Sequence, residues 1–401
     1  MRGPLIRSVV IAAGGTGGHF FPAEALAAEL ARRGQRIALL TDARSGGLAS
    51  PAFAGRERFV LRGAGIAGRG VLRGAGAIAS LAIGTVQARR ILARLHAGVL
   101  VGFGGYPSVA PVLASLLLRR RPAIVLHEQN AVLGRANRML ARRADRLALS
   151  LAATTRVPDG VRTSVTGNPV RPAIAALAAA PYAPPADEIR LLVLGGSLGA
   201  RVLSDVVPAA VAALPEGLRA RLRIAQQCRA EDLARVRDAY AAIGAEADLA
   251  PFFADVAGRL AAAHLVIARA GASTVAELAA IGRPAILVPL PHAIDDHQSA
   301  NARALAAAGA AWTMPQPAFT PAALAAEFVR LLGDPSSLAA TAAHAASLGR
   351  AGAAARVAAS ARRAGSPSSP CRCRASASGV NAGCGIIQAP PASVRARAFA
   401  V

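Results

Sequence analysis

The feature that most constrains this chain is a regular alternation of short apolar runs with longer stretches rich in alanine, leucine and arginine. Such alternation is typical of units in which parallel strands are joined by crossover helices. Strands are expected in two series, at residues 8–13, 36–40, 99–102, 123–126 and 146–149, and then at 189–194, 222–225, 265–268 and 285–288. The pattern therefore predicts an α/β protein with two doubly wound parallel sheets.

The two series are separated by a segment rich in proline and alanine at residues 172–185. A chain of 401 residues is too long for one ordinary core and suits two domains. We predict an N-terminal Rossmann-like domain at 1–171, a C-terminal one at 172–361, and a basic tail without fixed structure at 362–401. Ligands of such folds bind at the carboxyl ends of the strands, so the cleft between the domains is the expected site.

The positive charge of the chain comes from arginine alone. There are 46 basic residues against 22 acidic ones, a net charge of +24, and no lysine. The lack of lysine excludes Schiff-base chemistry and a P-loop lysine. Arginine suits phosphate and anionic lipid headgroups, although a GC-rich coding bias would give the same composition. Aromatic residues make up only 3% of the chain, which leaves few platforms for stacking bases, and we predict no nucleic-acid partner.

No segment is expected to span a membrane. Residues 97–118 are uncharged and long enough, but glycine and proline interrupt them, so strand, loop and helix fit better. The four cysteines form no disulfide framework and no CxxC pair, which favours a reducing, cytoplasmic setting. Cys371 and Cys373 lack further ligands at a sensible spacing, and no metal site is predicted.

A glycine-rich loop, Gly14 to Gly18, follows the first expected strand, and His19 opens the next helix. Glycines let a ligand approach the backbone closely, and a helix N-terminus favours negative charge. The dinucleotide fingerprint would need glycine in place of Phe20, so NAD binding is not expected. His19 is a candidate general base facing the cleft; the alternative is that it only completes the turn.

Other expected strands of the first half also end in glycine-rich or polar segments. GFGGYP occupies residues 102–107, HEQN occupies 127–130, and Arg171 stands at the domain junction. Four consecutive polar side chains after a strand are hard to explain by packing. An arginine at the junction can reach an anionic ligand in the cleft.

In the second half, GGSLGA at residues 195–200 matches the nucleophile elbow of α/β-hydrolases, with Ser197 as the nucleophile. Asp295 and His297 lie too close together in the sequence to supply the rest of a triad from separate loops. The favoured interpretation is a cradle in which backbone amides and the Ser197 hydroxyl bind phosphate.

A second phosphate-binding candidate is RAGASTVAE at residues 269–277. Read as structure alone, Ser273 caps the helix and Glu277 is a solvated partner of its dipole. Read as function, the turn and its hydroxyls hold phosphate, and Glu277 binds a sugar diol. Asp295 and Asp296 are a weaker candidate for a metal site.

Seven motifs together resemble one family closely, the MurG-type glycosyltransferases, in order and approximate spacing. They are GGTGGHFFPA, GFGGYPS, HEQNAVLGRANR, GNPVR, GGSLGAR, RAGASTVAEL and DDHQSANA. The resemblance covers about residues 8–361 and implies the GT-B architecture of two facing Rossmann-like domains with a cleft between them. It implies inverting transfer of N-acetylglucosamine from UDP-GlcNAc to the 4-hydroxyl of undecaprenyl-pyrophosphoryl-MurNAc-pentapeptide, which converts lipid I to lipid II in peptidoglycan synthesis.

The resemblance also implies the site residues. His19 is the candidate base, Glu277 holds the ribose hydroxyls, and the backbone of Phe253 meets the uracil. The implied substrate-binding residues are Thr16, Gly17, Gly18, Asn130, Arg171, Ser197, Phe253, Ala272, Ser273, Thr274, Val275, Ala276, Glu277 and Gln298. The leaving diphosphate is already an anion, so helix N-termini and Arg171 can stabilise it. No cofactor is required on this view, with stimulation by Mg²⁺ left open.

Membrane contact follows from the implied substrate and from two apolar stretches rimmed with arginine, at residues 71–95 and 112–121. An apolar face with cations around it suits the anionic inner leaflet, although helices packed on a sheet would look similar. The expected location is the cytoplasmic face of the inner membrane, with other cell-wall synthesis proteins as further partners. The alternatives are another nucleotide-sugar GT-B enzyme, a hydrolase using Ser197, or a non-catalytic basic binding protein.

Overall fold

The computed structural model describes residues 8–15, 17–43, 50–62, 71–178, 180–196 and 199–365, with the backbone alone at 71–75. All of them belong to one compact unit. Thr16, Ser197 and the tail cysteines Cys371, Cys373 and Cys384 lie outside the described residues. Within the described part, no helix is long and apolar enough to cross a membrane.

The first half of the chain builds a seven-stranded parallel sheet in the order β3-β2-β1-β4-β5-β6-β7. Its strands are β1 Val9–Ala12, β2 Ile37–Thr41, β3 Glu57–Val60, β4 Val99–Gly102, β5 Ala123–Glu128, β6 Arg146–Leu149 and β7 Thr163–Val165. The helices between them are α1 Gly17–Arg32, α3 Val71–Arg94, α4 Tyr106–Leu116 and α5 Arg135–Leu140.

The second half repeats this plan in a six-stranded parallel sheet of order β10-β9-β8-β11-β12-β13. Its strands are β8 Ile189–Leu194, β9 Leu222–Gln227, β10 Ala247–Ala250, β11 Leu265–Ala268, β12 Ala285–Leu287 and β13 Trp312–Thr313. Its helices are α6 Pro172–Ala176, α7 Arg201–Ala212, α8 Glu216–Arg219, α9 Leu233–Ala241, α10 Val256–Ala262, α11 Ala272–Ile281, α12 His297–Ala306, α13 Pro321–Leu332 and α14 Pro335–Leu348. In both sheets the strand order reverses at the first strand of the series, as in Rossmann folds, which confirms the predicted fold class.

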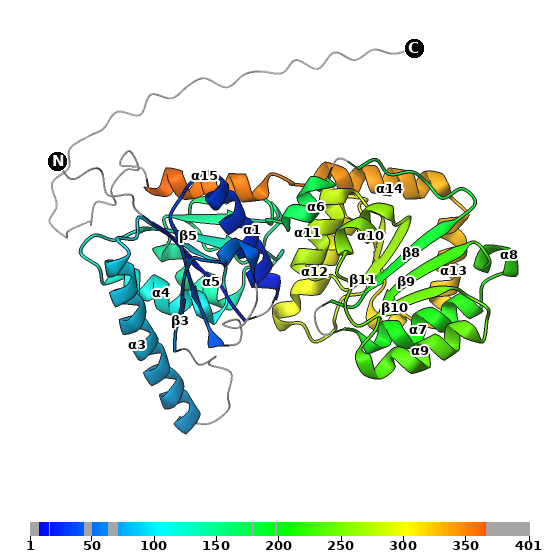
Figure 1. Cartoon of the computed structure of the whole chain (residues 1–401), viewed down its shortest axis with the longest axis horizontal. Coiled ribbons are helices and arrows are strands. Elements are labelled where there is room, and N and C mark those ends of the chain that lie inside the picture. Colours follow the sequence, from blue (N-terminus) through cyan, green and yellow to red (C-terminus); the bar gives the residue numbers. More distant parts are fainter. Residues whose placement is uncertain are drawn as a thin grey trace, which may run out of the picture. The chain divides into compact units, whose positions relative to one another are not determined.

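Both sheets are buried on both faces because helices cover each side (Figure 1). Alternate residues of one strand therefore enter different cores: Val10 and Ala12 lie in one cluster of the first sheet, and Val9 and Ile11 lie in the other. Continuous apolar runs such as VVIA are what parallel strands require. This pattern made the central strands predictable.

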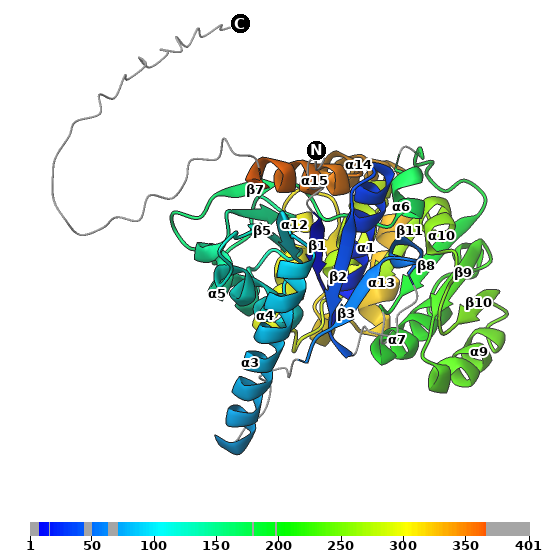
Figure 2. The same ribbon diagram turned by 60° about the vertical axis from the view of Figure 1, so that its left-hand side comes forward.

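The last helix, α15 (Ala353–Gly365), returns to the first sheet. Its residues Val357, Ala358 and Ala361 are buried in the core shared by β1 and α1. α15 lies beside α1 in both ribbon views (Figure 2). The helix runs beyond residue 362, where the tail was predicted to begin, and the residues after 365 lie outside the described part.

Candidate active site

His19 lies in the first turn of α1, immediately after the glycine loop that follows β1. Gly15 has a positive φ of 87° and donates its backbone N–H to Asp42 Oδ1 at 3.2 Å, so the loop turns sharply next to β2. Gly17 and Gly18 form the start of the helix. The Nδ1 atom of His19 lies 3.0 Å from Oε1 of Gln129, a residue 110 positions later in the chain.

The polar HEQN segment begins inside a strand rather than after it, because β5 continues to Glu128. His127, Glu128 and Gln129 are all buried. The Glu128 carboxylate accepts hydrogen bonds from the backbone and side chain of Asn130, from the Gly134 amide and from the Asn137 side chain. This carboxylate therefore organises the loop after β5, a structural role that the sequence did not reveal.

Asn130 connects the first half of the chain to the second. Its Oδ1 accepts a hydrogen bond from Asn301 Nδ2 at 3.1 Å, and Asn301 Oδ1 accepts one from the Ala131 amide at 2.8 Å. Asn301 lies in α12, is fully buried, and also donates to the Ala270 carbonyl. The loop after β5 and α12 are thus held together by two amide side chains, a partly exposed one from Asn130 and a buried one from Asn301.

Arg171 and Glu277 form a bidentate ion pair. Arg171 Nε lies 2.9 Å from Glu277 Oε1, and Arg171 Nη2 lies 3.1 Å from Glu277 Oε2. The Arg171 guanidinium also lies 5.6 Å from the ring centre of Phe21 in α1. The Glu277 side chain is 9% exposed, so the interpretation of it as a solvated dipole partner is wrong. Burial raises the pKa of Glu277, and the charge and hydrogen bond of Arg171 oppose this rise.

The first turn and a half of α11 contains the predicted residues Ala272, Ser273, Thr274, Val275, Ala276 and Glu277. Gly271, rather than Ser273, is the N-cap residue of α11, and no side chain caps the helix. Among the described residues, the buried Ser273 Oγ has no hydrogen-bond partner. Asn168 of the domain junction donates to the Ala272 carbonyl at 3.3 Å. An unpaired hydroxyl at a helix N-terminus is the arrangement that binds an anion.

The described part of the GGSLGA loop is fixed by its neighbours on β9. The Gly195 amide donates to Gln227 Oε1 at 3.2 Å, and Gly199 has a positive φ of 68°. A Cβ atom on Gly199 would come within 2.5 Å of Arg229 Cγ, so only glycine fits there. Ser197, between these positions, lies outside the described residues.

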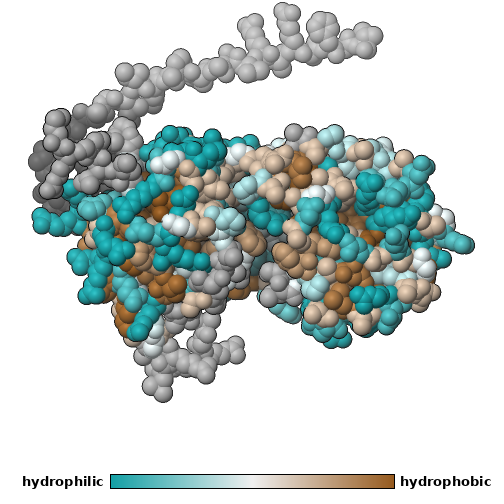
Figure 3. Space-filling view, viewed as in Figure 1, coloured by the Kyte–Doolittle hydropathy of each residue, from teal (hydrophilic) through white to brown (hydrophobic). Residues whose placement is uncertain are grey.

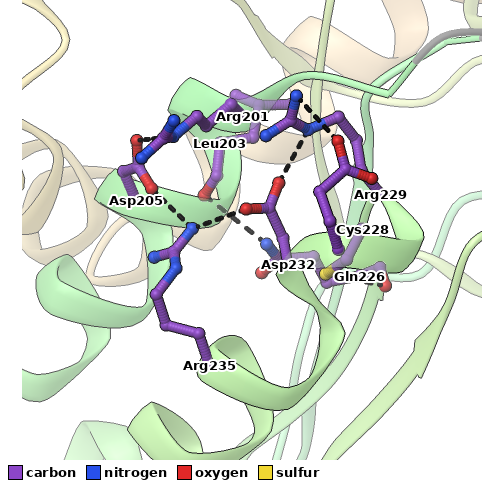
Figure 4. Close-up of polar contacts among 9 residues, drawn as sticks. Arg201, Leu203, Asp205, Gln226, Cys228, Arg229, Asp232 and Arg235 are labelled. Atoms are coloured by element: carbon purple, nitrogen blue, oxygen red, sulfur yellow. Dashed lines mark hydrogen bonds and ion pairs between the residues drawn. The ribbon is translucent and has the colours of Figure 1, made fainter.

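Arg229 is itself held by a network of ion pairs (Figure 4). Asp232 accepts from Arg229 at 2.7 Å and from Arg235 at 3.0 Å, and these bonds, led by that from Arg229, lower the pKa of Asp232. Arg235 also pairs with Asp205 of α7, which in turn pairs with Arg201. The arginines here are matched by carboxylates, so the network supports the loop.

The remaining predicted residues lie in separate local settings. Phe253 is buried in the second core, and Arg259 lies 4.1 Å from its ring centre. Gln298, the second residue of α12, accepts a hydrogen bond from the Leu290 amide. The Asp295 carboxylate pairs with Arg135 and Arg156 of the first half. The described residues contain no group of three or more His, Cys, Asp or Glu side chains placed to hold a metal ion.

The sequence missed Gln129, Glu128 and Asn301 as individual site residues. All three stood within quoted motifs, and the signal was available in the run of polar residues at the end of an apolar strand. The contact of Gln129 with His19 spans 110 positions, and that of Asn301 with Asn130 spans 171, so local spacing could not identify these pairs.

Comparison with known proteins identifies the family. Residues 9–149 match the glycosyltransferase family 28 N-terminal domain, and residues 190–357 match its C-terminal domain. A UDP-N-acetylglucosamine–N-acetylmuramyl-(pentapeptide) pyrophosphoryl-undecaprenol N-acetylglucosamine transferase of Granulibacter bethesdensis is 66% identical over 354 residues, covering 88% of this chain and 92% of its own. The enzyme of the same name from Acidiphilium cryptum is 60% identical over 347 residues, covering 86% and 94%.

A solved structure leads to the same family. The crystal structure of MurG from Acinetobacter baumannii matches with a TM-score of 0.72 at 30% identity, covering 89% of this chain and 99% of that one. The two matched domains, the sequence identity and the shared fold agree: this chain belongs to glycosyltransferase family 28 and is an enzyme of the MurG type.

Proposed function

We propose that His19 is the general base of an inverting N-acetylglucosaminyl transfer from UDP-GlcNAc to the 4-hydroxyl of the MurNAc unit in undecaprenyl-pyrophosphoryl-MurNAc-pentapeptide. The chain is an N-acetylglucosaminyltransferase, as its family and its 66% identical relative indicate. The observation that carries the proposal is the contact of His19 with Gln129, which orients the imidazole at the carboxyl end of the first sheet.

In the proposed reaction the acceptor oxygen attacks the anomeric carbon as the bond from that carbon to the diphosphate oxygen breaks. His19 takes the proton of the acceptor hydroxyl, and UDP leaves with the electron pair. General base catalysis of this kind contributes about 10²- to 10⁴-fold in rate. The imidazole is then protonated and returns its proton to solvent.

The start of α11 is the proposed binding site for the diphosphate. The helix supplies free backbone amides and the positive end of its dipole, and the unpaired Ser273 hydroxyl lies in its first turn. Glu277, one turn further on, is the proposed ligand of the ribose hydroxyls. Its present partner is Arg171, so Arg171 holds the carboxyl group oriented before the nucleotide binds.

The diphosphate can leave without a metal ion, because it is already an anion and the helix N-terminus supplies partial positive charge. Arg171 is the proposed further cation, although in this structure its guanidinium is paired with Glu277. We therefore propose that no cofactor is required. Transfer measured with EDTA and with added Mg²⁺ tests this. Activity that is abolished by EDTA and restored by Mg²⁺ would overturn it.

The direct test of the reaction is transfer of labelled sugar from UDP-GlcNAc to a short-chain lipid I analogue. We expect a β-1,4-linked product with stoichiometric release of UDP, and no product from UDP-GalNAc. Release of UDP without acceptor, or equal use of both donors, would contradict the proposed substrates.

We further propose that the protein binds the anionic face of the inner membrane through α3 and the end of α4. Ile78, Ile83 and Val86 of α3 and Leu117 after α4 are exposed, with exposed fractions from 44% to 67%. Exposed arginines flank them at positions 89, 90, 119 and 120. Figure 3 shows hydrophobic side chains among hydrophilic ones over this part of the first half. Each cation contributes about 1 kcal/mol near an anionic surface.

Vesicle sedimentation tests the membrane proposal. We expect binding to phosphatidylglycerol vesicles at about 0.15 M salt and little binding to phosphatidylcholine. Ile83→Asp should weaken binding, whereas Val329→Asp, at an equally exposed apolar residue of α13, should not. Equal effects of the two substitutions would show that α3 is not the binding surface.

A further inference from the structure

Three hydrogen bonds connect His19 to a backbone carbonyl in the interior of the first half. His19 Nδ1 lies 3.0 Å from Gln129 Oε1, Gln129 Nε2 lies 3.1 Å from His127 Nδ1, and His127 Nε2 lies 3.0 Å from the Gly167 carbonyl oxygen. His127 is 0% exposed and Gln129 is 3% exposed. The chain of contacts therefore runs from the partly exposed imidazole of His19 into the buried interior of the first half.

The inner end of this chain determines the protonation of His127. The Gly167 carbonyl can only accept, so His127 Nε2 must carry a hydrogen. Burial lowers the pKa of His127 to about 4, so this ring is neutral at physiological pH. Its Nδ1 atom is consequently an acceptor and receives a hydrogen bond from Gln129.

The orientation of the Gln129 amide follows from three acceptors around its nitrogen. Nε2 lies 3.0 Å from the Phe103 carbonyl and 3.1 Å from the His127 carbonyl, in addition to His127 Nδ1. A reversed amide would place its oxygen against two carbonyl oxygens, which is repulsive. The amide oxygen must therefore face His19.

The amide oxygen of Gln129 cannot donate, so His19 must donate from Nδ1. A neutral imidazole that carries its hydrogen on Nδ1 has its lone pair on Nε2. We infer that Gln129, backed by His127 and Gly167, is a positioning residue that fixes the tautomer of His19 and makes Nε2 the atom that takes the acceptor proton. This inference rests on the proposed role of His19 as the base.

Gly105 supports the assignment at the other edge of the ring. A Cβ atom at this position would lie 3.5 Å from His19 Cδ2 and 3.6 Å from Nε2. Gly105 has φ 65° and ψ 177°, a conformation that is essentially restricted to glycine. The second glycine loop thus brings bare backbone to the edge of the imidazole that carries the lone pair.

A neutral partner distinguishes this arrangement from a histidine paired with a carboxylate. The Gln129 oxygen orients the ring without adding a negative charge that would stabilise the imidazolium. Gln129→Glu supplies that charge and keeps one oxygen facing His19, while its second oxygen replaces Nε2 beside the carbonyls of Phe103 and His127. The two arrangements can therefore be separated by the pH dependence of turnover.

The first experiment is ¹⁵N NMR of the full-length protein labelled at its seven histidines, with the His19 signals assigned by their loss in His19→Gln. We expect neutral His19 as the Nδ1–H tautomer in the wild type. In Gln129→Met we expect a shift toward the Nε2–H tautomer, which predominates in water. A wild-type His19 in the Nε2–H form would overturn the inference, whatever the activity of the enzyme.

The second experiment is kinetic. We expect Gln129→Met to lower kcat about 10- to 100-fold with little change in KM for UDP-GlcNAc, a part of the general-base contribution. Gln129→Glu, measured on protein whose fold is verified by circular dichroism, should move the acidic limb of the kcat/KM profile to higher pH. The matched control, Gln226→Met, removes another buried glutamine and should lower stability without moving the pH profile.

The outcomes separate this inference from the proposed role of His19. If His19→Ala retains turnover, His19 is not the base, yet the NMR signal still reports whether Gln129 sets its tautomer. If His19→Ala is inactive while Gln129→Met keeps wild-type kcat and pH profile, His19 remains the base and the positioning role of Gln129 is wrong.

Discussion

His19 and Glu277 are the two side chains proposed to meet the substrates most directly, and the protein holds them in different ways. His19 in the first half contacts the uncharged amide of Gln129, whereas Glu277 in the second half pairs with the charged guanidinium of Arg171. A base must change its charge during each turnover, and a neutral partner orients it without favouring the protonated ring. A ligand of ribose needs a fixed orientation, and the two hydrogen bonds from Arg171 supply it.

The two halves share the same type of strand order, yet they hold the proposed functional side chain differently at the carboxyl ends of their strands. The first half uses an uncharged partner, and the second half uses a charged one. In the first half, the proposed base is partly exposed, and the buried residues His127 and Gln129 lie behind it. In the second half, the functional carboxylate itself is buried. The following four predictions test this comparison.

The largest effect is expected from His19→Ala. Loss of the base should lower kcat about 10²- to 10⁴-fold, with little change in KM for UDP-GlcNAc, because the donor contacts lie mainly in the second half. The transfer assay with the lipid I analogue measures this. His344→Ala, at an exposed histidine of α14, is the matched control and should leave kcat unchanged. Near-normal turnover of His19→Ala would assign the proton to another group.

His127 should make the stability of the protein depend on pH. Its folded pKa of about 4 lies below the ordinary value of 6.5, so between these values only the unfolded chain binds the proton. The free energy of unfolding is therefore highest above the pKa that His127 has in the unfolded chain. It falls by up to about 3 kcal/mol as the pH drops from about 6.5 to about 4. Urea unfolding between about pH 7 and pH 4 should show a smaller loss for His127→Gln. Equal losses would contradict the burial of a neutral His127.

Glu277→Gln should separate function from stability. Because burial raises the pKa of Glu277, the charged form is costly in the folded state, and wild-type stability decreases as the pH rises above the unfolded value. The neutral variant loses the ion pair with Arg171 but also the cost of burying a charge, and Arg171 remains 27% exposed to solvent. We therefore expect its free energy of unfolding at about pH 7 to lie within about 1 kcal/mol of the wild-type value. KM for UDP-GlcNAc should rise about tenfold, or about 1.4 kcal/mol. A marked loss of stability with unchanged KM would make the ion pair purely structural.

Asp295→Asn should give the smallest effect and the opposite pH dependence. Burial raises the pKa of Asp295, but hydrogen bonds from Arg156 and Arg135 outweigh this and lower it. The contribution of Asp295 to the free energy of unfolding is therefore present above the pKa that it has in the unfolded chain, and it is lost as the pH falls through its lower folded pKa. Both arginines are largely exposed, so we expect about 0.5–1 kcal/mol, weakened by salt. Asp296→Asn is the control, because its partner Arg303 lies in the helix α12 that Asp296 directly precedes, and not in the first half of the chain.

The central strands, both glycine loops and the family could be predicted from the sequence, because apolar runs and motifs are local. The edge strands β3, β7, β10 and β13 were missed because ERFV, TSV, ADLA and WT are short and only partly apolar. Pairings such as Arg171 with Glu277 join residues 106 positions apart, and no spacing rule reveals them. The purely structural interpretation, in which Ser273 caps the helix, is wrong because Gly271 occupies the N-cap position.

The return of α15 to the first sheet means that the two halves of this enzyme are not independent folding units. A polypeptide ending at residue 171 would lack Val357, Ala358 and Ala361, and would leave a strip of its own core beside α1 in contact with water. A polypeptide with residues 180–365 would contain α15, the helix that the first fragment lacks. The two fragments should therefore behave as a split protein. Each should fold poorly when expressed alone, and α15 should dock on the first sheet when the fragments are mixed.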